Sequence, residues 1–255
     1  MAEFDKKDSD GLRCVYEKMN RWIPLLILAV AAFFRFYALD LKPPHFDEGV
    51  NGWFVDQMAK TGYFRYDPEN YHGPLHFYIL FIFQTLFGRN VMALRMPLVI
   101  TSLATVWLML RFDRFLDRRV CWFAAAAMAV SPAFTFYARY AIHESEMVFF
   151  MILLFFGAAG LWKYGEKKYL WLFGAGLTGM ILTKETYLVH LCCFGLAMLS
   201  LRILEFFSPS LGWEEVAAQR WSGKDLAYVC VAGGWRFYFS IQVDSLIFRH
   251  YKDSI

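Results

Sequence analysis

An acidic pair, Asp47 and Glu48, follows directly after two prolines and a histidine, and it is the first place in the sequence where chemistry is expected. Pro43 and Pro44 stop a preceding helix, because proline lacks a backbone N–H and restricts the residue before it. One interpretation of the pair is a solvated acidic loop or a helix start, where Asp and Glu are favourable in the first turn. The other is a general base, Asp47, beside a second carboxylate that binds a metal or positions an acceptor.

Further ionisable residues border the apolar segments. Arg139 and Glu144 follow one apolar run, Lys184 and Glu185 lie between two others, and His72 opens a tight His-Gly-Pro turn. Ionisable groups at membrane depth are costly and are usually functional. A carboxylate base beside fixed cations suits transfer from a lipid-linked phosphate, because the cations hold the negative charge that grows on the departing phosphate. The plain alternative is that pairs such as Lys184 and Glu185 only turn the chain at a membrane surface.

The composition indicates the class of protein to which these residues belong. The chain has 255 residues, of which 58% are hydrophobic and 19% are charged, whereas soluble domains are about 45–50% apolar and about 25% charged. The 26 Lys and Arg nearly balance the 23 Asp and Glu, so no long-range field indicates a nucleic-acid partner. Five cysteines form no CxxC pair, which argues against a disulfide scaffold or a zinc site. The composition therefore indicates a membrane protein whose partner is the lipid bilayer.

About six segments are long enough to cross a bilayer, which requires about 20 mostly apolar residues. The shorter ones are completed by flanking residues and by Lys or Arg side chains that reach the headgroups. The predicted spans are Trp22–Leu39, Val91–Leu110, Val120–Ala138, Met147–Trp162, Tyr169–Thr183 and Thr186–Leu201. The sequence therefore predicts an all-α, polytopic membrane protein.

The segment Pro74–Phe87 decides the topology, because its 14 residues are too few to cross comfortably. If it lies along the interface, 15 Lys and Arg fall in the inside segments and 6 in the outside segments. If it crosses, the counts are 8 and 13. The positive-inside rule favours the first arrangement. It places Asp47, Glu48, His72, Arg139, Glu144, Lys184 and Glu185 at one external face.

The domain organisation follows from this topology. Residues 1–21 form a cytoplasmic tail, and the apolar run after them is a retained first span rather than a signal peptide. Residues 22–207 form the membrane module, with an external loop at 40–73 and an interfacial helix at 74–87. Residues 208–255 are atypical, because the apolar stretch 226–241 contains Arg236 and two adjacent glycines, and this suits a truncated product.

Several motifs resemble the GT-C superfamily of polytopic glycosyltransferases, which includes the protein O-mannosyltransferases and the aminoarabinose transferases. They resemble more closely a subgroup of flippase-activity-associated membrane proteins that is linked with archaeal-type protein N-glycosylation. The likeness covers residues 22–205. The motifs are HFDE at 45–48, YFRYDP at 63–68, YHGPL at 71–75, LFG at 86–88, ALRMP at 93–97, and the stretch from the Ser-Pro at 131–132 to Glu144.

The resemblance implies a GT-C fold with external juxtamembrane helices. It also implies inverting transfer of a hexose or pentose from a polyprenyl-phosphate donor to a protein or glycan acceptor outside the cytoplasm. By position, Asp47 matches the catalytic acid, with Glu48 beside it, and a divalent cation, if one is used, would bind these two carboxylates. Arg139, Lys184 and His72 are the expected contacts of the donor phosphate. The expected supporting residues are His45, Arg95, Glu144 and Glu185.

Two other functions are compatible with the same residues. The chain could be a non-enzymatic protein of the cell membrane that assists translocation of lipid-linked oligosaccharides, or an inactive truncated remnant. Asp47 separates the first of these from a transferase, because a translocation helper tolerates Asn at this position whereas a transferase needs the carboxylate.

Overall fold

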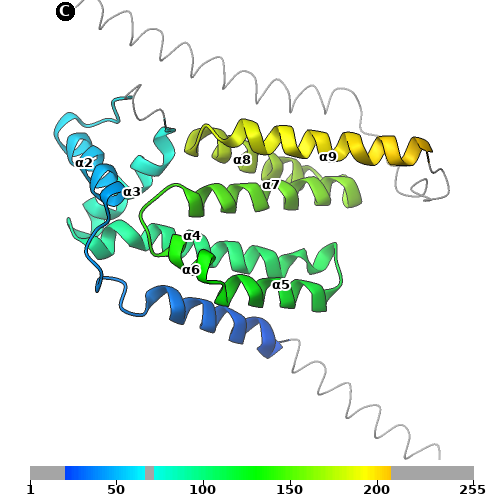
Figure 1. Cartoon of the computed structure of the whole chain (residues 1–255), viewed down its shortest axis with the longest axis horizontal. Helices are drawn as coiled ribbons and strands as arrows, with labels where there is room; N and C mark the ends of the chain where they lie inside the picture. The colour runs from blue at the N-terminus through cyan, green and yellow to red at the C-terminus, as the bar shows by residue number, and fades with distance from the viewer. Residues whose placement is uncertain (1–20, 67–71, 208–255) are drawn as a thin grey trace, which may run out of the picture. The chain divides into compact units, whose positions relative to one another are not determined.

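The computed structural model describes residues 21–66 and 72–207, and in this part of the chain all regular structure is helical (Figure 1). A helix over residues 21–36 comes first. The helices that follow are α2 (Phe46–Thr61), α3 (Pro74–Phe87), α4 (Val91–Arg111), the short 3-10 helix η1 (Phe112–Arg114), α5 (Arg118–Val130), α6 (Pro132–Ala138), α7 (Glu144–Tyr164), α8 (Lys167–Thr183) and α9 (Tyr187–Phe207). The predicted all-α class is confirmed. The predicted segment 208–255 lies outside the described residues, as do residues 1–20 of the predicted tail 1–21.

Each predicted span falls on a helix, but the helices differ in how well they suit a membrane. Among the described residues, Val91–Arg114 and Glu144–Tyr164 are long and apolar enough to cross. The pair α5 and α6, bent by 61° at Ser131, qualifies as one broken span. The predicted interfacial segment 74–87 forms α3 with the predicted ends, and Pro74 is its first residue, where a missing N–H costs nothing. Its orientation in a membrane stays a prediction.

The helices form two compact units. The first contains the described residues of Met1–Gly52 and Ile82–Ser145, and the second those of Trp53–Phe81 and Glu146–Ile255. Each unit is described by itself below.

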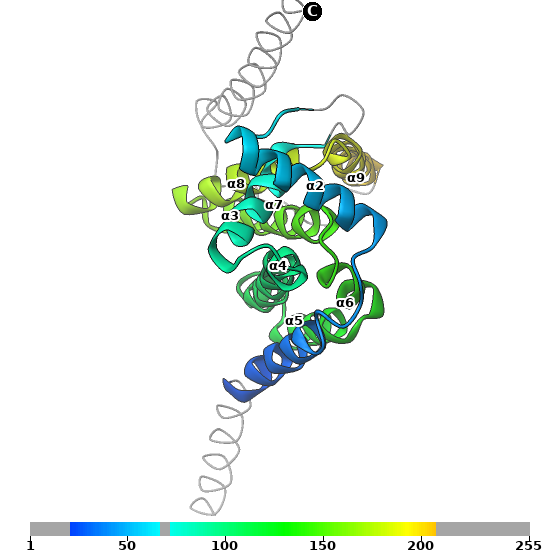
Figure 2. The same cartoon turned by 90° about the vertical axis from the view of Figure 1, so that its left-hand side faces the viewer.

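In the first unit, α4, α5 and α6 pack together with the helix over residues 21–36 (Figure 2). Arg35, the one charge in the predicted first span, is fully buried there. It donates to Ser102 Oγ at 2.8 Å and to the carbonyls of Met128 and Ala129, both at 3.1 Å. These carbonyls lie in the last turn of α5, and Pro132 has no N–H to donate to the Met128 carbonyl. Arg35 therefore bonds the broken end of α5 to the first helix.

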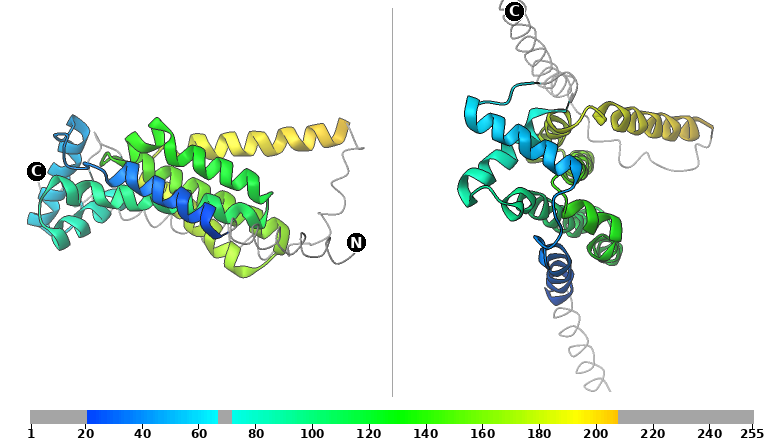
Figure 3. Two further views of the ribbon diagram at one scale, coloured as in Figure 1. Left: turned by 90° about the horizontal axis from the view of Figure 1, so that it is seen from below. Right: turned by 60° about the vertical axis from the view of Figure 1, so that its left-hand side comes forward.

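In the second unit, α7 and α8 approach closely at glycines. A Cβ atom added to Gly176 would meet the backbone of Leu154, and one added to Gly157 would meet the backbone of Phe173. Small residues at such crossings let membrane helices touch backbone to backbone. A buried cluster of Met147, Leu154 and Met180 joins the two helices. The start of α9 packs on this cluster, and α9 then diverges from α8 toward its C-terminal end (Figure 3).

Candidate active site

Arg95 of α4 fixes the irregular segment that precedes the acidic pair. Its guanidinium donates to both carboxylate oxygens of Glu48, each at 2.7 Å. It also donates to the carbonyls of Leu39 at 2.8 Å, Lys42 at 3.0 Å and Pro43 at 3.3 Å. The Arg95 side chain is 4% exposed, so these contacts are shielded from water. A bidentate, charge-assisted pair of this kind is directional as well as strong, and it holds the loop against α4.

Glu48 is fully buried and its carboxylate is completely engaged. Besides Arg95, it accepts from the backbone N–H groups of Ala141 and His45, each at 3.0 Å. Burial alone raises the pKa of the Glu48 carboxyl, but the hydrogen bonds from Arg95, Ala141 and His45, with the charge of Arg95, outweigh it and lower the pKa below its ordinary value. Glu48 therefore joins α2 to α4 and to the segment after α6. The expected role of Glu48 at the reacting atoms or on a metal does not suit this buried, fully bonded position.

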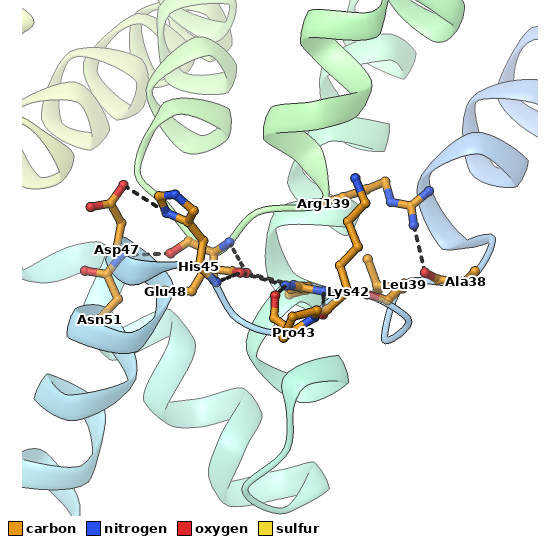
Figure 4. Close-up of polar contacts among 11 residues, drawn as sticks. Ala38, Leu39, Lys42, Pro43, His45, Asp47, Glu48, Asn51 and Arg139 are labelled. Carbon is orange, nitrogen blue, oxygen red and sulfur yellow. Dashed lines mark hydrogen bonds and ion pairs between the residues drawn. The ribbon is translucent and has the colours of Figure 1, made fainter.

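Asp47 has the opposite environment, although it is the adjacent residue. Its side chain is 58% exposed, and its nearest ionic contact is His45 Nδ1 at 3.7 Å, itself on a side chain that is 60% exposed. The His45 ring lies 5.1 Å from the Tyr140 ring, measured between centroids. In Figure 4 the side chains of His45 and Asp47 extend to one side of the loop, away from the Glu48 carboxylate. The helix-start interpretation of the pair is confirmed, since both acids lie in the first turn of α2.

Asn51 is a residue of this cluster that the sequence analysis missed. It is 5% exposed, lies on α2 one turn after Glu48, and donates through Nδ2 to the Ala141 carbonyl at 2.8 Å. Glu48 and Asn51 thus bond the N–H and the C=O of the same residue, Ala141. The only sequence signal was a polar residue three positions after Glu48, on the same helix face.

Arg139 follows α6 and reaches the end of the first helix. It donates to the Phe34 carbonyl at 3.1 Å and to the Ala38 carbonyl at 2.8 Å. Ala38 has a φ of 49°, a left-handed conformation that is unusual for a residue with a Cβ atom. The Arg139 side chain remains partly exposed. Ala38 and the loop after it are therefore bonded through their carbonyls to two arginines.

The second unit contains the other expected donor contacts. His72 Nδ1 lies 2.9 Å from Glu185 Oε2, and both side chains are partly exposed. Next to it the Gly73 N–H donates to the Thr183 carbonyl at 3.2 Å, and a Cβ atom at Gly73 would collide with the Leu182 carbonyl. The His-Gly-Pro turn therefore docks on the end of α8. Lys184 belongs to the same turn between α8 and α9 and is partly exposed.

A second histidine–carboxylate pair in this unit was also missed by sequence reasoning. His76 Nδ1 lies 2.9 Å from Glu146 Oε2, with side-chain exposures of 0% and 1%. Glu146 Oε1 has no hydrogen-bond partner among the described residues. The expected supporting residue Glu144 begins α7 and is partly exposed.

The structure thus brings together His45, Asp47, Glu48 and Arg95 in the first unit, and His72 with Glu185 in the second. Convergence of these two groups on one membrane face stays a prediction. In residues 21–66 and 72–207, no three or more His, Cys, Asp or Glu side chains are grouped closely enough to hold a metal ion. A divalent cation at Asp47 would find Glu48 already committed to Arg95 and to two backbone N–H groups.

Comparison with known proteins shows which solved structure has a similar fold. The fold is similar to the crystal structure of ArnT from Cupriavidus metallidurans bound to undecaprenyl phosphate, with a TM-score of 0.60 and 16% sequence identity. The likeness covers 84% of this chain and 40% of that one, so the chain spans about two fifths of the ArnT length. It confirms the predicted GT-C fold. No curated protein sequence matches the chain.

A family profile identifies the chain more directly. The profile described as dolichyl-phosphate-mannose-protein mannosyltransferase matches residues 71–213. This stretch includes the His-Gly-Pro turn, α4, the bent pair α5 and α6, and the turn that contains Lys184. Because the match spans more than half of the 255 residues, the chain belongs to the dolichyl-phosphate-mannose-protein mannosyltransferase family.

Proposed function

We propose that the chain transfers a sugar from a polyprenyl-phosphate-linked donor to an acceptor on the extracytoplasmic face of the cell membrane. The observation that carries the proposal is the different burial of two adjacent carboxylates. Glu48 is buried and bonded to Arg95, whereas the adjacent Asp47 has an exposed carboxylate. A general base needs this arrangement, because it must be fixed in place and still reach a proton on a bound substrate. Family membership and the ArnT-like fold support the choice of reaction.

The proposed step is a single displacement with inversion. Asp47 accepts the proton of the acceptor hydroxyl or amide, and the acceptor forms a bond to the anomeric carbon of the sugar. The bond from that carbon to the phosphate oxygen breaks, and polyprenyl phosphate leaves with the electron pair. Arg139 stabilises the negative charge that develops on the phosphate. This stabilisation is effective when the cation is in place before the reaction begins. His72 and Lys184 are proposed as further donor contacts, with Glu185 orienting His72.

Glu48 and Arg95 have a positioning role in this mechanism. Together they fix the loop carbonyls, the first turn of α2 and the Ala141 N–H. A base in the first turn of a helix that follows an irregular segment needs such support, because small displacements of a catalytic group reduce the rate strongly. His45 and Glu144 are proposed to support Asp47 and Arg139, respectively. The N-terminus is placed in the cytoplasm, following the positive-inside count.

The proposal is tested by Asp47→Asn in membranes that contain the full chain. We expect turnover to fall by about 10²–10⁴-fold, because an amide cannot accept the acceptor's proton. The measurement is transfer of labelled hexose or pentose from polyprenyl-phosphate donors. Asp40→Asn is the matched control, since Asp40 is an exposed acid of the same loop outside α2, and it should keep full activity.

Full activity in Asp47→Asn would contradict the proposal. It would favour instead the assistance of lipid-linked oligosaccharide translocation, the function suggested by the resemblance to flippase-activity-associated proteins. Absence of transfer and of translocation in the unaltered chain would favour an inactive remnant. Equal expression and membrane insertion of all variants would show that a difference in their transfer activity arises from the chemistry and not from folding.

A further inference from the structure

The turn between α4 and α5 lies at the opposite end of α4 from its first residues and is rich in arginine (Figure 1). Arg95 bonds Glu48 near the start of α4, whereas the turn begins at the last residue of α4, about 24 Å further along the helix axis. The turn is therefore separate from the acidic pair. Residues 111–119 contain two aspartates, no lysine and four arginines, which are Arg111, Arg114, Arg118 and Arg119.

The backbone of this turn is held by its own hydrogen bonds. The Phe112 carbonyl accepts from the N–H groups of Phe115 at 2.8 Å and of Leu116 at 2.9 Å. The rings of Phe112 and Phe115 lie edge to face, with their centroids 5.9 Å apart. Asp117 caps α5, because its Oδ1 accepts from the Arg119 N–H at 2.8 Å. The arginine side chains therefore extend from an ordered backbone.

The acidic side chains of the turn leave guanidinium donors available. Asp113 Oδ2 lies 3.8 Å from Arg118 Nε, and both side chains are in contact with water. A guanidinium has five N–H donors, so this long contact leaves most of the Arg118 donors for another acceptor. Arg111 forms no ion pair with a carboxylate in residues 21–66 and 72–207. Arg111 and Arg118 are thus two cations that can bind an anion.

Apolar side chains accompany these cations. The guanidinium carbon of Arg111 lies 6.0 Å from the centroid of the Trp107 ring, within the range of cation–π attraction. Trp107 is 52% exposed, and tryptophan is enriched at the depth where lipid headgroups meet acyl chains. On the turn and the first part of α5, the apolar side chains of Leu116, Val120 and Phe123 are also exposed. Cations beside exposed apolar side chains suit a ligand with an anionic headgroup and acyl chains.

We propose that Arg111, Arg118 and Trp107 form a binding site for an anionic phospholipid of the leaflet at this turn. The two guanidinium groups bind the headgroup phosphate, and the indole ring contacts the lipid below the headgroup. Arginine suits this role, because its planar set of N–H donors matches two phosphate oxygens at once. The proposal is independent of sugar transfer. The plain alternative is that the arginines only orient the chain through the positive-inside rule and bind no particular lipid.

The test measures binding of phosphatidylglycerol to the purified full chain in an uncharged detergent. Bromine atoms on the acyl chains quench tryptophan fluorescence at short range, so saturable quenching reports a lipid bound beside a tryptophan. The chain has nine tryptophans, and we expect Trp107→Phe to remove the saturable part of the quenching. Arg111→Gln should raise the half-saturating lipid concentration about fivefold, and Arg111→Gln combined with Arg118→Gln should raise it roughly 25-fold.

Matched variants separate this site from a general effect of charge. Arg111→Lys keeps the charge but loses the planar set of donors, so it should recover part of the affinity. Lys167→Gln is the control, because Lys167 is an exposed cation at the start of α8, and its affinity should equal that of the unaltered chain. If Arg111→Gln does not fold, Arg118→Gln alone decides the test, with about a fivefold loss expected.

Other ligands decide whether the site selects an anionic phospholipid. Brominated phosphatidylcholine, whose headgroup has no net charge, should quench without any dependence on Arg111. Inorganic phosphate should not displace phosphatidylglycerol, because it has no acyl chains. Equal affinity for the two lipids, or displacement by phosphate, would overturn the assignment of the ligand. Unchanged affinity in Arg111→Gln, or an equal loss in Lys167→Gln, would show that the arginines only orient the chain.

Discussion

Glu48 in the first unit and Glu146 in the second are both fully buried, but their surroundings differ. Glu48 accepts hydrogen bonds from Arg95 and from two backbone N–H groups. Glu146 bonds His76 through one oxygen, and its other oxygen has no hydrogen-bond partner among the described residues. Irregular backbone needs partners for its polar groups, which helices already have. The first unit therefore uses a polar network to hold a loop, whereas the second relies on helices that touch at glycines.

The largest expected effect comes from breaking the network of the first unit. Arg95→Met leaves the Glu48 carboxylate buried without its cation, and loss of one partner of a buried pair costs about 3–5 kcal/mol of folding free energy. Thermal unfolding in detergent should show a large fall in the midpoint temperature. Arg119→Met removes an exposed arginine of α5 as the control and should change little. Equal stability of the two variants would show that the network does not hold the loop.

A smaller effect is expected from the helix contact of the second unit. Gly176→Ala places a methyl group against the backbone of Leu154, and overpacking of this kind costs about 1–3 kcal/mol. Gly174→Ala, two residues earlier on α8, meets nothing within 4 Å and should be neutral or slightly stabilising. Thermal unfolding of the pair measures the contact directly. A fall in stability for both variants would mean that glycine content, rather than close approach, matters in α8.

The smallest effect is the acid dependence of the first unit. The Glu48 pKa is lowered in the folded chain, so its contribution to stability is fully present above the ordinary value of 4.5. It is lost as the pH falls through the lowered pKa of the folded state, where the carboxyl takes up a proton. Unfolding temperatures measured from neutral to acid pH should therefore show the unaltered chain losing its advantage over Glu48→Gln. If the unaltered chain stays more stable than Glu48→Gln at the lowest pH, the ionised Glu48 carboxylate is not the source of the difference, which contradicts a stabilising ion pair with Arg95.

Local features of the structure could be predicted from the sequence because they depend on neighbouring residues. The prolines at 43–44 and the acids that follow predicted a helix start, and α2 begins at Phe46. Pro74 and the apolar run after it predicted α3 with its exact ends. The bend between α5 and α6 falls at the Ser-Pro of 131–132, where proline cannot continue the hydrogen bonds of a helix. Hydrophobic period, helix caps and prolines act within one or two turns, so they can be recognised without the fold.

The burial of each polar side chain could not be predicted in the same way. Glu48 meets Arg95 47 residues later and the Ala141 N–H 93 residues later. The pairing of His76 with Glu146 spans 70 residues. None of these separations has a sequence signature, because the contacts depend on how α2, α3, α4 and α7 are rotated against their neighbours.

The sequence by itself therefore determined the helices, their breaks, the membrane character and the helix start that carries the acidic pair. Only the tertiary structure decided which of the two acids faces water. In a helix, adjacent residues point about 100° apart, so one of them can face a packed neighbour while the other stays exposed. Glu48 is buried against α4 and Ala141, where Arg95 supplies the positive charge that offsets the cost of burying a carboxylate. Asp47 does not make this contact, and its side chain stays exposed.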